Sequence, residues 1–90
     1  MAIAALTASY AEIAADITAL SIIQVQMPKD GSPAFAEVLA AASAPSAATR
    51  GIQLAAGEAA TGDNITAIGA SGKLYARLYF SEFPTNLYTA

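Results

Sequence analysis

The chain contains no cysteine, no histidine and no tryptophan among its 90 residues. Without cysteine it forms no disulfide and offers no thiolate nucleophile, and without histidine as well it lacks the usual nitrogen and sulfur ligands of zinc. A serine nucleophile would also lack the histidine base that commonly activates it. We therefore predict no metal site, no cofactor site, no catalytic residues and no enzymatic activity.

Charge is scarce as well. Only 12% of the residues are charged, and four Lys or Arg stand against seven Asp or Glu, for a net charge of -3. Surfaces that bind nucleic acid need clustered basic residues, so we expect no nucleic-acid partner.

The apolar N-terminal stretch does not resemble a membrane or export segment. No basic residue precedes Lys29, so the positively charged start of a signal peptide is missing. Glu12 and Asp16 interrupt the stretch, and each carboxylate would cost about 2.5 to 3.5 kcal/mol at the centre of a bilayer. We expect neither a signal peptide nor a membrane-spanning helix.

The length of 90 residues is that of one small domain, residues 1–90. A chain of this size buries only about 60 to 65% of its unfolded surface, so the monomer is expected to be marginally stable. About a quarter of the residues are alanine, and each alanine buries little apolar area. We therefore expect a homo-oligomer.

Residues 3–20 fit two patterns. Large side chains recur every three or four residues, which favours an oligomerisation helix with Ile3, Leu6, Tyr10, Ile13, Ile17 and Leu20 on one stripe. The other interpretation is a pair of strands at 9–14 and 21–27, the second with Ile23, Val25 and Met27 facing inward. A turn at 28–31 then follows. Both interpretations stay open, and residues 1–20 are a candidate assembly arm or helix.

The rest of the chain favours short strands. Residues 32–42 fit either a helix or a strand, whereas 51–54 alternate apolar and polar as a strand does. Residues 64–68 and 73–80, separated by a Gly-rich turn, predict a β-hairpin. The predicted fold is mainly β, a small antiparallel sandwich or barrel with or without a short N-terminal helix. The alternative is an α+β fold with an N-terminal oligomerisation helix.

The segment 73–80 has two different faces. One face carries Leu74, Ala76, Leu78 and Phe80, and the other carries Tyr75, Arg77 and Tyr79. Tyr and Arg are enriched at the centres of protein interfaces, so Tyr75, Arg77 and Tyr79 are candidate partner-binding residues. The alternative is that the two tyrosines only cover a neighbouring strand or loop, with Arg77 solvated between them.

Several short segments resemble small structural proteins of tailed bacteriophages: SYAEI at 9–13, IIQVQ at 22–26, APS at 44–46, GIQLAAGE at 51–58 and GKLYAR at 72–77. The resemblance implies a β-sandwich without an active site, present in many copies in a virion. It implies a capsid decoration or tail component, made in the host cytoplasm, whose partners are copies of itself and a larger capsid or tail protein. The alternatives are a receptor- or glycan-binding module that uses Tyr75 and Tyr79, and a helical adaptor.

Overall fold

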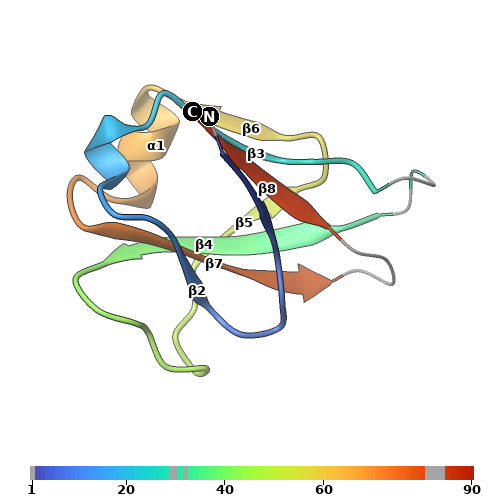
Figure 1. Cartoon of the computed structure of the whole chain (residues 1–90), viewed down its shortest axis with the longest axis horizontal. Helices are drawn as coiled ribbons and strands as arrows, with labels where there is room; N and C mark the ends of the chain where they lie inside the picture. Colours follow the sequence, from blue (N-terminus) through green and yellow to red (C-terminus); the bar gives the residue numbers. More distant parts are fainter. Residues whose placement is uncertain (1, 29–30, 32, 81–84) are drawn as a thin grey trace.

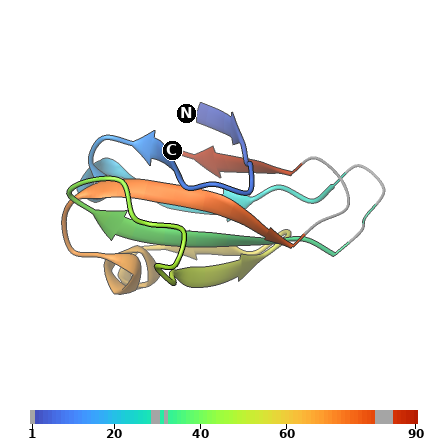
Figure 2. The same cartoon turned by 90° about the horizontal axis from the view of Figure 1, so that it is seen from below.

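The computed structural model describes residues 2–28, 31, 33–80 and 85–90. Their strands form two antiparallel four-stranded sheets. The first sheet has the order β1 (Ala2–Ala5), β8 (Asn86–Thr89), β3 (Ile22–Val25) and β6 (Ala59–Thr61). The second has the order β2 (Ala11–Ala14), β7 (Lys73–Phe80), β4 (Phe35–Ala41) and β5 (Ile52–Ala55). The predicted mainly β fold is confirmed, and the two layers are visible in Figures 1 and 2.

The core lies between the two sheets. Ile23, Val25 and Leu87 enter it from the first sheet, and Val38 and Leu74 enter it from the second; all five are fully buried. In β3, β4 and β7 apolar residues recur at every second position, which places them on one face. In β8 the two inward residues are Leu87 and Thr89. Burying a side chain of this size stabilises the fold by about 1.5 to 3 kcal/mol.

Of the two interpretations of residues 3–20, the helix is wrong, and the strand at 9–14 is confirmed as β2. The segment contains β1, β2 and a single 3-10 turn, η1 (Ile17–Ala19), whose N-terminus is capped by the Asp16 carboxylate. Between the strands the chain passes from one sheet to the other. Leu6 donates its N–H to Thr85 at the end of the first sheet, while the carbonyl of Thr7 accepts from Leu78 in the second. The residues of the apolar stripe are therefore divided among β1, β2, η1 and the connections between them, and β1 and β2 are strands of the two sheets.

The strand predicted at 21–27 is confirmed as β3, with Ile23 and Val25 inside. Met27 does not face the core: it lies beyond the end of β3, and 56% of its surface is exposed. At the predicted turn, Gly31 donates its N–H to the carbonyl of Pro28, whereas residues 29 and 30 lie outside the described residues.

The alternatives for residues 32–42 resolve in favour of the strand β4, and the strand at 51–54 is confirmed as β5. The predicted hairpin is wrong in its first arm, because residues 63–68 form a helix, α1 (Asp63–Ile68). Ile65 and Ile68 are three residues apart, so one helical face packs both against the core. The second arm is β7, which pairs with β4 and β2 instead.

Glycines allow α1 to lie close to the second sheet. Gly62, which precedes the helix, has φ of 51°, a conformation that side chains disfavour. Gly69, which follows it, lies directly against Ala40 of β4, and a Cβ at this position would overlap the Ala40 Cβ. Gly62 therefore permits the turn into the helix, and Gly69 permits the helix to end against β4 at the edge of the sandwich (Figure 1).

The folded chain exposes 4902 Å² of surface. A folded monomeric protein of 9.1 kDa exposes roughly 4,900 Å². The chain therefore buries as much of itself as an ordinary monomer of its mass, and any association adds to a fold that is already closed.

Candidate functional site

The three residues predicted to bind a partner lie on the outer face of β7, but they do not form one open surface. Tyr75 is 5% exposed and Arg77 is 9% exposed, whereas Tyr79 is 43% exposed. Two of the three side chains are therefore buried in the isolated chain. The solvated Arg77 of the alternative interpretation is not found either.

Arg77 is buried because it forms an ion pair with Glu37, which lies directly opposite it on β4. The guanidinium approaches the Glu37 Oε1 atom with Nε at 2.7 Å and Nη2 at 2.6 Å. The second carboxylate oxygen, Oε2, accepts the backbone N–H of Gly51 at 2.8 Å. Both oxygens of this buried carboxylate are thus paired, as a buried charge requires.

The same arginine holds the loop 42–51, which connects β4 to β5. Its Nη1 atom donates to the carbonyl of Ala47 at 2.8 Å, and Nη2 donates to the carbonyl of Thr49 at 3.2 Å. The ring of Tyr10 lies 4.2 Å from the guanidinium carbon, and the Tyr10 hydroxyl donates to Thr49 as well. We name Tyr10, Glu37 and Arg77 with these loop carbonyls the clamp.

The clamp changes the pKa of two of its side chains, Glu37 and Tyr10. Burial alone raises the pKa of the Glu37 carboxyl, but the hydrogen bonds from Gly51 and Arg77 and the positive charge of Arg77 outweigh burial and hold the pKa below its ordinary value. Burial and the nearby Glu37 charge raise the pKa of Tyr10. Glu37 is therefore ionised at neutral pH and Tyr10 is neutral.

The exposed side of the clamp carries one further cation and aromatic pair. The Arg50 guanidinium lies 5.4 Å from the centre of the Tyr79 ring and donates to its hydroxyl at 3.4 Å. Arg50 also lies 4.0 Å from Glu37. This pair is the part of the predicted β7 surface that solvent reaches.

Sequence reasoning missed Glu37 and Tyr10. Glu37 is the single acid within the apolar strand Phe35–Ala41, and an acid in a run that is otherwise buried signals a buried cation partner. Its partner is 40 residues away, and neither sequence spacing nor a short motif links the two. The clamp therefore became visible only with the register of β4 and β7.

The first sheet differs sharply from the second in charge. None of the residues in β1, β8, β3 and β6, all of them described, is charged, whereas the strands of the second sheet contain Glu12, Glu37, Lys73 and Arg77. The register places Ile3, Tyr88, Gln24 and Ala59 side by side across the first sheet, on the face that points away from the core. We name this outward surface of the first sheet the uncharged face.

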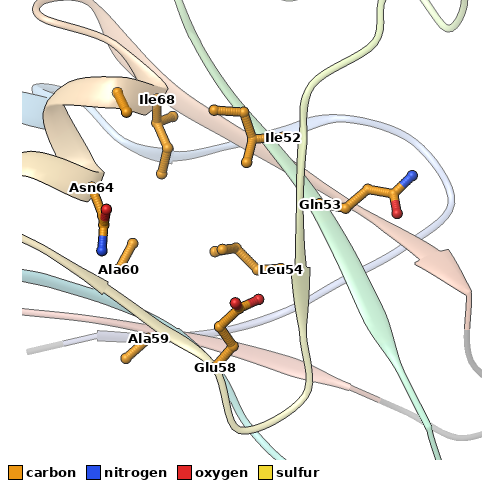
Figure 3. Close-up of a pocket in the computed structure, with 9 residues that line it drawn as sticks. Ile52, Gln53, Leu54, Glu58, Ala59, Ala60, Asn64 and Ile68 are labelled. Carbon is orange, nitrogen blue, oxygen red and sulfur yellow. The ribbon is translucent and has the colours of Figure 1, made fainter.

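A cavity of about 250 Å³ opens where β5 and β6 face each other, under α1. Figure 3 shows Ile52, Leu54 and Ile68 pointing into it and Gln53 pointing away. The Glu58 carboxylate at its rim accepts the N–H of Ala55 at 2.9 Å. The cavity is lined by Ile52, Gln53, Leu54, Glu58, Ala59, Ala60, Asn64, Ala67 and Ile68.

Within the described residues, no cluster of three or more acidic, cysteine or histidine side chains is arranged to hold a metal ion. The helices in this part of the chain are too short to cross a bilayer. Comparison with protein-family models, with curated proteins and with solved structures finds no match to this chain.

Proposed function

We propose that this protein is a non-enzymatic structural subunit of a tailed-phage virion, a capsid decoration or tail component present in many copies. It acts by binding copies of itself and a larger capsid or tail protein. The observation that carries the proposal is the uncharged face, an entire sheet surface without a charged residue on a chain whose net charge is -3.

The composition of this face suits protein contacts. Charged residues are depleted at the centres of protein interfaces, and tyrosine is enriched there. Ile3 is 57% exposed, and Tyr88 and Gln24 are half-buried beside it. The Gln24 amide and the Tyr88 phenol both donate and accept hydrogen bonds, so they can pair with polar groups of a partner without adding a charge.

The outer surfaces of the two sheets differ in how well they suit contact with a partner. The second sheet is less suited to this role because the clamp and the loop 42–51 cover part of its outer surface.

Size-exclusion chromatography with light scattering, on the protein alone and with candidate virion proteins, tests the proposal. The informative variant is Gln24→Glu, which adds one carboxylate to the centre of the uncharged face. We expect it to weaken association about tenfold, because a desolvated or repelled charge costs more than the amide it replaces. The matched control is Asn64→Asp at an exposed position of α1, outside the uncharged face, which makes the same change in net charge and is expected to leave association unchanged.

Two results would contradict the proposal. One is a strictly monomeric protein that leaves purified virions unbound. The other is turnover of a small molecule by the purified chain.

A further inference from the structure

Each sheet has two edge strands, and an exposed edge is a template for pairing with another chain. Three of the four edges carry a feature that hinders such pairing. β2 has an irregular register between Glu12 and Ala14, and its Glu12 forms an ion pair with Lys73 at 3.3 Å. On β5 the N–H of Ala55 is already bonded to Glu58. β6 is only three residues long and runs directly into the turn before α1.

β1 carries none of these features. Its residues Ala2–Ala5 contain no charge and no proline, and its register with β8 is continuous from Ala2 to Ala5. Ile3 projects from it with 57% of its surface exposed. Among the edges of the described sheets, β1 is the one left open.

The pairing with β8 fixes which backbone groups of β1 are free. Leu6 donates its N–H to Thr85, and hydrogen bonding alternates along an antiparallel pair. Ala4 and Ala2 therefore direct their N–H and C=O groups toward β8, whereas Ile3 and Ala5 direct theirs to the open side. Ile3 and Ala5 therefore present free N–H and C=O groups two residues apart, which is the spacing that a further antiparallel strand requires.

We propose that β1 pairs with β1 of a second copy of this chain, antiparallel and around a two-fold axis at Ala4. This inference rests on the self-association in the proposed function and specifies one of its contacts. In this register Ile3 of each copy lies opposite Ala5 of the other, so a large side chain meets a small one and four backbone hydrogen bonds form between the copies. The two first sheets become one sheet of eight strands with a continuous uncharged face.

The charge distribution selects a second copy as the occupant. Two chains of net charge -3 repel each other, and the contact costs least where neither copy presents a charge. β1 and its neighbour β8 have none. With four residues from each copy, the contact buries less than the roughly 1,200 Å² of a stable interface. It is therefore weak between two isolated copies and becomes stronger when many copies are held in an array.

Cross-linking tests the inference, because the native chain has no cysteine. In the proposed register the two Ala4 residues form a non-hydrogen-bonded pair with Cα atoms about 4.5 Å apart, within the range that a disulfide spans. Under mild oxidation, Ala4→Cys is expected to form a covalent dimer at least tenfold faster than Ala59→Cys, the matched control on the other edge of the same sheet. Adding Ala5→Lys to Ala4→Cys is expected to remove most of the dimer, and circular dichroism of the reduced variants verifies that each is folded.

The outcomes separate this contact from the proposed function. Equal rates for Ala4→Cys and Ala59→Cys indicate random collision and overturn the inference. So does a folded Ala4→Cys variant that does not cross-link while the unsubstituted protein still self-associates or binds virions, and in that case the proposed function stands. A chain that neither self-associates, nor binds virions, nor cross-links overturns both.

Discussion

Glu37 and Arg77 lie directly opposite each other on β4 and β7, with the Arg77 Nη2 and Glu37 Oε1 atoms 2.6 Å apart. Glu37 is 1% exposed and Arg77 is 9% exposed. They form the only ion pair between two buried side chains in the described part of the chain. It joins the two central strands of the second sheet to the loop 42–51.

Removing either member of the pair is expected to destabilise the protein. Glu37→Ala leaves the Arg77 cation buried without its counter-ion, and a loss of this kind typically costs about 3 to 5 kcal/mol. Chemical denaturation measures it. The double variant Glu37→Leu with Arg77→Met is expected to lose less stability than the sum of the losses of Glu37→Leu and Arg77→Met made singly, because no buried charge remains. Additive losses would show that the two side chains act independently.

Acid is expected to weaken the fold through Glu37. Its pKa is lower in the folded chain than in the unfolded chain, so its contribution to stability is complete above the unfolded pKa and is lost as pH falls through the folded pKa. The free energy of unfolding should therefore decline below about pH 4. Glu37→Gln should be less stable at pH 7 and show a shallower decline. The acid dependence that remains includes Asp16, whose pKa is lowered by its hydrogen bonds with Thr18. Parallel curves for the two proteins would contradict this role of Glu37.

The two tyrosines of β7 are expected to respond differently to substitution. Tyr75→Ala opens a cavity in a buried site, and large aromatic truncations of this kind cost about 3 to 5 kcal/mol. Tyr79→Ala loses only an exposed contact with Arg50, which is worth about 0.5 to 1 kcal/mol. Thermal and urea unfolding of the two variants measure the difference. A test of ligand binding should therefore use Tyr79→Ala alone, since the double variant would also be destabilised at Tyr75.

Gly51 is expected to tolerate no side chain. A Cβ at this position would lie 2.5 Å from the carbonyl oxygen of Val38, and the Gly51 N–H binds the Glu37 carboxylate. Gly51→Ala must displace the start of β5 from β4, at a cost of about 1 to 3 kcal/mol. The control is Ala48→Ser in the same loop, at an exposed position where the change should stay within about 0.5 kcal/mol. Equal stability of the two variants would show that the close approach is not maintained in solution.

The sequence pattern was sufficient where local alternation and burial agree. β3, β5 and β7 each show apolar residues at every second position, and each forms where the pattern predicts it. The two faces of β7 were also separated correctly. The apolar face lies in the core, because Leu74 and Ala76 are buried there.

The local pattern was insufficient where the same spacing of apolar residues fits both a helix and strands. Asn64 to Ile68 alternates like a strand, yet Ile65 and Ile68 also share a helical face, and the glycines at 62 and 69 favour the helix. In residues 3–20 the apolar residues with helical spacing lie in two strands of different sheets, in the 3-10 turn and in the connections between them.

The clamp was out of reach for a different reason. Tyr10, Glu37 and Arg77 come from three separate parts of the chain, and only the pairing of β4 with β7 brings the two charges together. The choice of pairing partner depends on the whole chain and is not encoded in any one segment. Tyr75 and Arg77 are buried as a result of that pairing. The sequence of β7 alone does not show it, so this face of the strand was predicted to be open.

The pairing of β1 with β8 joins the first described strand to the last, with Ala2 opposite Thr89. Contacts between residues so distant in sequence form slowly, because a long loop must close before they contribute any stability. The first sheet therefore stays incomplete until β8 is in place, because β8 is the only strand of this sheet to which β1 is hydrogen-bonded among the described residues.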